Sequence, residues 1–214
     1  MCFSASASAV AALVTGGAGM AALSRCTRPE EIPLAGMPLL FSLQQTIESG
    51  LWLYLPGGTG QPRALLLANL FAAVALIVWP LLVPIAIGLV EPVRRRLLYL
   101  LLTLPGLGAA LFAAMALAHQ PVAVTLARGS ICYIVPWPYP LAASVAYMAA
   151  TCLPPLLSSH SLLRLFGAVV AAGLVVSYTA YIDAFLSVWC FFAALASLML
   201  AGFFHVRVTA LQQE

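Results

Sequence analysis

Seven mainly apolar stretches follow one another along the chain, separated by short polar connections or by connections rich in proline and glycine. A helix needs about 20 apolar residues to cross a bilayer core about 30 Å thick. The stretches that meet this need cover residues 4–23, 32–55, 65–90, 97–118, 140–157, 162–182 and 185–205. The pattern therefore predicts an all-α fold, a seven-transmembrane-helix bundle in one transmembrane helical domain over residues 1–214.

Polar residues interrupt the second stretch. Gln44, Glu48 and Trp52 are spaced four apart, so on a helix they form one stripe, and Gln45 lies beside it. A carboxylate at membrane depth costs at least about 2.5 kcal/mol on insertion scales. We therefore expect the stripe to face the interior of the bundle or a wet cavity.

Prolines predict two irregular regions. Pro80 and Pro84 each remove a backbone donor from the third stretch, so we expect a bend near Trp79–Pro84 that faces the bundle, where other groups can reach the freed carbonyls. The connection from His119 to Tyr139 is rich in proline and aromatic residues towards its end. We expect an irregular loop there, at the membrane–water interface.

Composition supports a polytopic membrane protein. Hydrophobic residues make up 64% of the chain and charged residues 7%, and the mean hydropathy is +1.07. The net charge of +3 is too small and too scattered for a nucleic-acid surface, so the expected surroundings are the lipid bilayer.

The nine basic side chains are all arginines, and they are unevenly placed. Seven fall at ends of stretches on one side: Arg25, Arg28, Arg94, Arg95, Arg96, Arg164 and Arg207. Arg63 and Arg128 fall on the other side. Because cytoplasmic loops carry the excess of arginine, the distribution predicts the N-terminus out and the C-terminus in.

This topology gathers polar side chains from several helices in the outer half of the bundle. We predict an outward-facing polar pocket around Glu48, with a ligand-binding set of Glu48, Gln44, Gln45, Tyr178, Tyr181 and Ser187. His160, at the end of the fifth stretch, is a secondary candidate. It could act as a proton-linked residue or ligand, or it could cap helix carbonyls at the interface.

The five cysteines show no paired spacing, so a disulfide framework is not expected. Cys2, Glu48 and Cys190 form a candidate metal or redox site, because thiolates are natural ligands of zinc and copper(I). The alternative is that each cysteine is a small apolar filler. The cofactor is therefore unknown, with a metal ion as one option.

Catalytic motifs are missing. The chain has no G-x-S-x-G, no HExxH and no phosphate-binding glycine loop. Seven-span hydrolases that bind zinc through three histidines need His pairs four apart, whereas His119, His160 and His205 are isolated. Whether the protein is an enzyme stays undecided.

Five strings carry a resemblance to a known family: MCFSASAS, PLLFSLQQTIESGLW, WPLLVP, ATCLPPLLSSH and SVWCFFAALAS. They resemble bacterial multi-span membrane proteins of a family of unknown function, DUF6629, over Met1 to about Ser197. The resemblance implies a small seven-helix membrane protein of bacteria, which indicates a multi-pass protein of the bacterial cytoplasmic (inner) membrane. It implies no activity.

Three functional hypotheses remain open. The first is ligand or ion binding, sensing or transport through the pocket around Glu48. The second is a membrane-embedded enzyme or a metal or redox protein that uses Cys2, Glu48 and Cys190. The third is an accessory subunit that packs against a membrane-complex partner or a second copy of itself.

Overall fold

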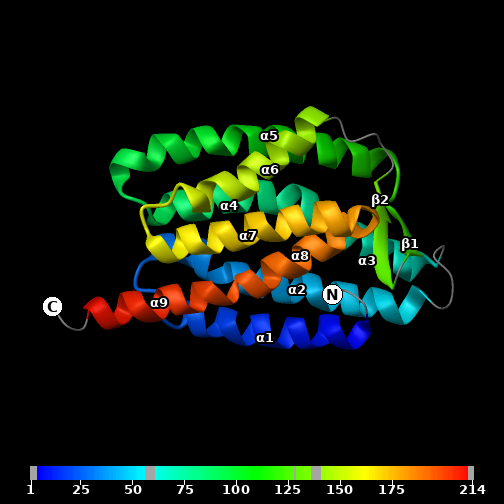
Figure 1. Cartoon of the computed structure of the whole chain (residues 1–214), viewed down its shortest axis with the longest axis horizontal. Helices are drawn as coiled ribbons and strands as arrows, with labels where there is room; N and C mark the ends of the chain where they lie inside the picture. The colour runs from blue at the N-terminus through cyan, green and yellow to red at the C-terminus, as the bar shows by residue number, and fades with distance from the viewer. Residues whose placement is uncertain (1–3, 56–60, 128, 136–140, 212–214) are drawn as a thin grey trace.

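The protein is a bundle of helices that run along one long axis, with a small hairpin at one end (Figure 1). The computed structural model describes residues 4–55, 61–127, 129–135 and 141–211. Its α-helices are α1 (Ala5–Leu23), α2 (Ile32–Tyr54), α3 (Pro62–Ala73), α4 (Trp79–Val90), α5 (Arg96–His119), α6 (Leu141–Leu156), α7 (Ser161–Ala180), α8 (Phe185–Ala196) and α9 (Leu198–Leu211). A π-helical segment, η3 (Val74–Val78), joins α3 to α4, and short 3₁₀ turns precede α2, α5 and α8.

Helices lie on each of the seven predicted stretches. Five helical segments are long and apolar enough to cross a membrane, by length and composition: Ala5–Leu23, Pro62–Val90, Val93–His119, Ser161–Ala180 and Ile182–Arg207. Two helices fall outside this set for different reasons. The α2 helix carries polar residues along its length, and α6 has only 16 residues. The chain is thus mostly helical, with the apolar spans of a membrane protein.

The all-α prediction is wrong for part of the connection after α5. Strands β1 (Ala123–Ala127) and β2 (Ser130–Ile134) form an antiparallel hairpin there, and Gly129 in the turn has a φ of +72°. These segments hold the β-branched and aromatic residues that favour strands. Val124 and Ile131 are buried, and Tyr133 stacks on Phe71 of α3 with 4.5 Å between ring centroids. The hairpin therefore closes one end of the bundle.

The third predicted stretch departs from an α-helix one turn before Pro80. At the end of η3 the Trp79 N–H donates to the Val74 carbonyl, five residues back. The same pattern would pair the Ala75 carbonyl with Pro80, which has no N–H. The Tyr147 hydroxyl of α6 donates to the Ala75 carbonyl instead, at 2.8 Å. The irregularity faces the bundle, and a side chain supplies the donor that the proline lacks.

Small residues let neighbouring helices approach closely. A Cβ atom on Gly106 of α5 would overlap the carbonyl of Pro80 in α4. On the other side of the bundle α1 packs along α2, and Ser42 and Ser49 donate to the carbonyls of Ala12 and Ala5 at 2.7 and 2.9 Å. This is the small-residue packing typical of membrane helices.

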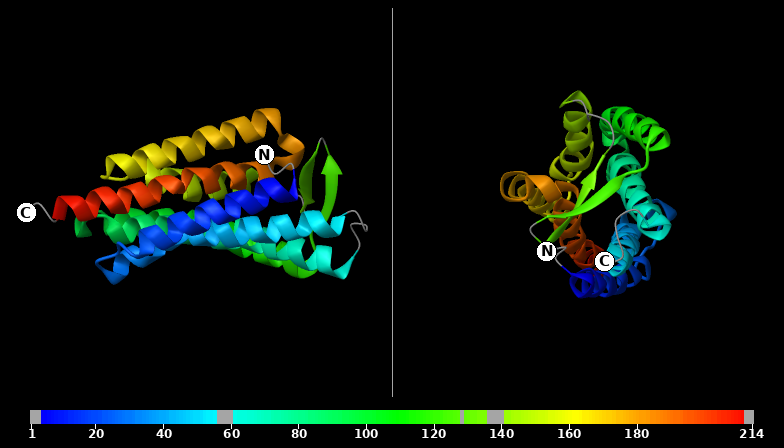
Figure 2. Two further views of the ribbon diagram at one scale, coloured as in Figure 1. Left: turned by 90° about the horizontal axis from the view of Figure 1, so that it is seen from below. Right: turned by 90° about the vertical axis from the view of Figure 1, so that its right-hand side faces the viewer.

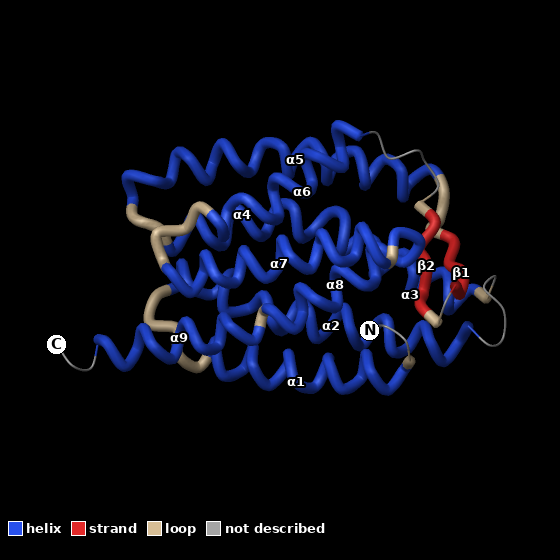
Figure 3. Tube along the Cα trace, in the orientation of Figure 1, coloured by secondary structure: helices blue, strands red, loops and turns tan. Residues whose placement is uncertain are grey.

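The two ends of the bundle differ in their charges. The α1 helix begins near the hairpin, and α9 ends at the opposite end of the bundle (Figures 1 and 2). The α1–α2, α4–α5 and α6–α7 connections lie at the same end as the end of α9 (Figure 3). The seven arginines that the sequence placed together lie in these connections, in the first turns of α5 and α7, and in α9. We call this the arginine end and the other the hairpin end.

Candidate binding site in a buried polar layer

Three polar side chains of α2 are completely buried. Gln44, Gln45 and Glu48 each have an exposed fraction of 0%. They occupy adjacent positions on two successive turns, so the helix presents them together to its neighbours. The expectation that the stripe faces the interior is thus met for Gln44 and Glu48, whereas Trp52 is half-buried towards the hairpin end.

Glu48 accepts a hydrogen bond from a side chain of α8. The Ser187 hydroxyl, itself fully buried, donates to Oε1 of Glu48 at 2.5 Å. Ser187 lies in the first turn of α8. The structure therefore brings together two residues of the predicted ligand-binding set that are 139 positions apart.

Gln44 uses both ends of its amide. Its Oε1 accepts from the indole N–H of Trp79 at 2.8 Å, and its Nε2 donates to Sγ of Cys190 at 3.4 Å. Because one partner can only donate and the other accepts, these bonds define the orientation of the amide. Gln44 thereby ties α2 to α4 and α8. The sequence analysis did not include Trp79 in the site, although the sequence shows that Trp79 lies beside Pro80 inside an apolar helix.

Gln45 differs from Gln44. Among the described residues neither its Nε2 nor its Oε1 has a hydrogen-bond partner. It lies on α2 between Ser42 and Ser49, which both bond to α1, so it lies on the face of α2 that packs against α1. The Ser8 hydroxyl of α1 is also buried, and it too has no hydrogen-bond partner among the described residues.

We call this set the buried polar layer: Ser8, Gln44, Gln45, Glu48, Trp79, Ser187 and Cys190. A buried amide without partners costs about 1–3 kcal/mol. Such a group in a native protein indicates an unseen partner such as a water molecule, an ion or a ligand.

Two cavities lie near the layer, one inside the bundle and one at the hairpin end. The inner one has a volume of about 40 Å³ and is lined by Trp79 and Cys190 of the layer. The outer one has a volume of about 210 Å³ and is lined by Asp183 and Ser144. Tyr147 lines both cavities. The inner cavity has room for a water molecule, but its lining is almost entirely apolar, and neither cavity is lined by Glu48 or Gln45.

The remaining predicted residues lie elsewhere. Tyr178 is 57% exposed and packs edge-on against Phe185, and Tyr181 packs beside Cys132 and Val188. Cys2 lies outside the described residues. Within the described ranges no group of three or more His, Cys, Asp and Glu side chains is placed to hold a metal ion.

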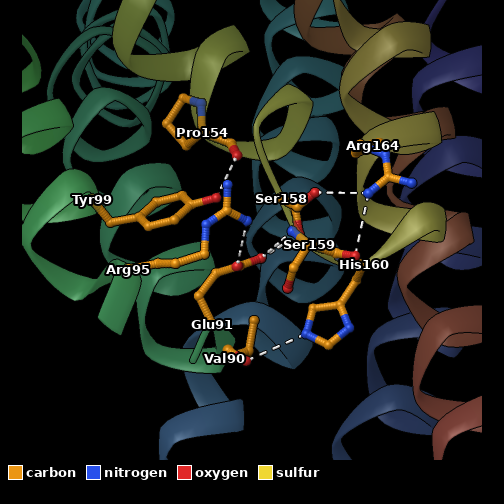
Figure 4. A network of polar contacts seen from close by, with 9 residues as sticks. All are labelled: Val90, Glu91, Arg95, Tyr99, Pro154, Ser158, Ser159, His160 and Arg164. Carbon is orange, nitrogen blue, oxygen red and sulfur yellow. Dashed lines mark hydrogen bonds and ion pairs between the residues drawn. The ribbon is translucent and has the colours of Figure 1, made fainter. Parts of the chain in front are cut away.

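A second polar network lies at the arginine end (Figure 4). Glu91, between α4 and α5, is 3% exposed. Its Oε1 accepts from the Ser158 hydroxyl at 2.5 Å and the Ser159 N–H at 2.8 Å, and its Oε2 accepts from Arg95 at 3.0 Å. Burial by itself would raise the pKa of Glu91, but the bonds from Ser158, Ser159 and Arg95 outweigh it and hold the pKa below its ordinary value. The network links the α4–α5 connection to the α6–α7 connection by hydrogen bonds.

His160 belongs to this second network. Its Nε2 lies 3.4 Å from the carbonyl of Val90, the last residue of α4, and its ring packs edge-on against Phe203. It lies at the start of α7, at the opposite end of the bundle from the hairpin. The structure therefore does not bring His160 to the buried polar layer.

Comparison with protein families gives one match. The model described as "Family of unknown function (DUF6629)" matches residues 1–214, so the chain belongs to this family. No curated protein and no solved structure matches.

Proposed function

We propose that this member of a family of unknown function binds a small cation, a proton or an alkali-metal ion, in the buried polar layer. The observation that carries the proposal is the Gln45 amide, which is fully buried one turn from Glu48 and has no hydrogen-bond partner among the described residues. An ion or a hydrated proton at this position would give the amide oxygen a partner.

The chemistry of the layer fits a hard cation. It offers one carboxylate, two amide oxygens and two hydroxyls, from Glu48, Gln44, Gln45, Ser8 and Ser187. Oxygen donors of these types suit hard cations, whereas zinc and copper(I) prefer imidazole and thiolate. An ionisable side chain at membrane depth is also the usual mark of an ion or proton pathway.

An access route runs from the hairpin end. The outer cavity carries the exposed carboxylate of Asp183, which attracts cations, and Tyr147 lines both this cavity and the inner cavity beside Cys190. Cys190 in turn accepts from Gln44. This succession supports an ion-linked sensor or transporter.

Seven membrane crossings with the N-terminus outside form part of this proposal, in the cytoplasmic membrane of a bacterium. It is supported by helices on all seven stretches, by the positions of the two chain ends at opposite ends of the bundle, and by the arginines at one of them. The polar face of α2 is buried, so this helix can cross without exposing it to lipid.

Cysteine labelling tests this orientation. Native Cys26 is a poor reporter because burial, and then the nearby Glu31 carboxylate, raise the pKa of its thiol. In a background without native cysteines, Thr125→Cys in β1 should react with an external impermeant probe, and Thr209→Cys in α9 should react only after permeabilisation. The reverse result would invert the topology.

The binding site is tested by cation-dependent stability of the purified protein. We expect sodium, lithium or protons to raise the midpoint of thermal unfolding in a saturable way, and Glu48→Gln to remove this response while the protein still folds. Gln45→Leu should weaken cation affinity about tenfold, equivalent to about 1.4 kcal/mol. It should also raise the cation-free midpoint, because it removes an unsatisfied amide.

The matched control is Thr46→Val, on the exposed face of the same helix, where the hydroxyl bonds only to its own helix at the Ser42 carbonyl. It should keep the full cation response. An equal response of the wild type and Glu48→Gln would overturn the proposal. Stoichiometric zinc or copper in the purified protein would favour the metal or redox hypothesis instead.

A further inference from the structure

We propose that the arginine end binds one anionic phospholipid, with its headgroup in a charged cavity and an acyl chain in the groove between α4 and α5. This site is separate from the buried polar layer, and it does not depend on cation binding there.

The headgroup cavity has a volume of about 340 Å³ and lies between the α1–α2 connection, the α4–α5 connection, the start of α7 and α9. Arg28, Arg96, Arg207 and His160 line it. These side chains come from four separate parts of the chain, so the fold assembles their positive charge. Arginines gathered in a cavity at this end of a helix bundle fit phosphate-bearing headgroups. The same lining holds three carboxylates, from Glu30, Glu31 and Glu91.

Two of the acidic side chains in the same cavity already bond to other groups of the protein. Glu31 pairs with Arg207 at 3.0 Å and accepts from the Thr27 N–H at 2.8 Å. Glu91 is bonded by Arg95 and the two serines described above. Glu30 is exposed and is the remaining carboxylate in the lining.

The arginines retain donors for a ligand. In the part of the chain that the structure describes, Arg28 and Arg96 form no ion pair. Nη1 of Arg207 is buried and has no hydrogen-bond partner among the same residues. A buried guanidinium nitrogen without an acceptor points to an absent anion, and phosphate oxygens match the geometry of this group.

An apolar groove continues from this cavity along the outside of the bundle. It has a volume of about 460 Å³, and its lining includes Pro84, Gly88, Leu100 and Thr103. A Cβ atom on Gly88 would overlap the side chain of Tyr99, so the glycine lets α4 pack closely against α5 beside the groove. The groove lies on a surface with exposed leucines, including Leu97 at 66% and Leu100 at 64%, which suits contact with acyl chains.

Two residues connect the charged cavity with the apolar groove. Leu89 and Arg96 line both the charged cavity and the apolar groove. A soluble phosphate would use only the cavity, and a hydrocarbon only the groove. A phospholipid with an anionic headgroup uses both at once, with Arg96 at the boundary between them.

Lipid binding can be measured on the delipidated protein in micelles by native mass spectrometry and thermal unfolding. We expect phosphatidylglycerol to bind at one copy per chain and to raise the unfolding midpoint. Phosphatidylcholine with the same acyl chains, and soluble glycerol phosphate, should bind at least about tenfold more weakly, a difference of about 1.4 kcal/mol.

Variants separate the two halves of the site. Arg28→Gln and Arg96→Gln should each weaken phosphatidylglycerol binding about fivefold, whereas the matched control Arg94→Gln, exposed on the same connection but outside the cavity, should not. Thr103→Phe should obstruct the groove and weaken lipid binding without changing the response to glycerol phosphate.

Three results would each overturn the proposal: equal retention of phosphatidylcholine and phosphatidylglycerol, glycerol phosphate binding as tightly as the lipid, or Arg28→Gln and Arg96→Gln behaving like Arg94→Gln. The second result would assign the cavity to a soluble anion. The unfolding midpoint of each variant without added lipid should match that of the wild type, so loss of folding can be told apart from loss of lipid binding.

Discussion

Glu91 and Glu48 are both buried carboxylates, but the structure surrounds them differently. Glu91 accepts from two serine donors and an arginine, all from connections at one end of the bundle. Glu48 lies inside a helix among neutral polar groups. Ser187 donates to it, and one turn away lies the Gln45 amide, which has no hydrogen-bond partner among the described residues.

In our proposal, this difference separates a structural carboxylate, Glu91, from one that binds a ligand, Glu48. Where the protein supplies charged and neutral donors to a buried carboxylate, that carboxylate holds the connections together, and its oxygens are not left to bind a ligand. Where a neighbouring buried amide still lacks partners, the same burial leaves room for a bound species. The predictions below test this contrast in order of expected effect.

Glu91→Ala should have the largest effect on stability. It leaves Arg95, the Ser158 hydroxyl and the Ser159 N–H without their acceptor, and breaking a buried ion pair in this way costs about 3–5 kcal/mol. The measurement is unfolding in detergent micelles. Glu30→Ala, on an exposed carboxylate near the same end, is the control and should change stability by less than about 0.5 kcal/mol. Equal losses in both variants would contradict a structural role for Glu91.

A matched pair of glutamate-to-glutamine changes compares the two regions directly. Glu91→Gln weakens hydrogen bonds to a charged acceptor and should cost about 1.5–3 kcal/mol. Glu48→Gln keeps an oxygen that can accept from Ser187, so it should cost less than about 1.5 kcal/mol. Only Glu48→Gln should abolish the cation response. If both variants lose stability equally and neither alters cation binding, the contrast between the two carboxylates fails.

Substitutions of two buried tyrosines should have smaller effects on stability. Tyr147→Phe removes the donor to the Ala75 carbonyl, at 2.8 Å, and should cost about 1 kcal/mol. Tyr99→Phe removes a longer bond, 3.3 Å, to the Pro154 carbonyl and should cost less. Stopped-flow measurement of cation binding should show a changed rate only for Tyr147→Phe, because Tyr147 lines both cavities near the layer and Tyr99 lines neither of them. A changed rate for Tyr99→Phe would place the access route elsewhere.

The pH dependence of stability should give the smallest effect. The folded pKa of Glu91 lies below its ordinary value of 4.5, so its stabilising contribution is complete above pH 4.5 and is lost as the pH falls through the lower folded pKa. The stability difference between the wild type and Glu91→Gln should therefore shrink only below pH 4.5. A difference that disappears at higher pH would mean that the carboxylate is not held by its donors.

The sequence by itself predicted the helices, the burial of the α2 stripe and the gathering of seven arginines at one end. These follow from local rules, because residues four apart share a helix face and because long apolar runs form helices in a bilayer. Ser187 was also identified as a neighbour of Glu48, since the alternation of spans places the start of α8 at the depth of that residue.

The tertiary structure alone decided which polar groups are satisfied. Gln44 and Gln45 are adjacent in sequence, yet the first bonds to Trp79 and Cys190 and the second has no partner among the described residues. The hairpin likewise replaced an expected loop, because Val124, Ile131 and Tyr133 find a surface to pack on at the end of the bundle. Helical periodicity gives the direction of a side chain, but the rotation and distance of the facing helices determine whether it meets a donor, another side chain or an open cavity.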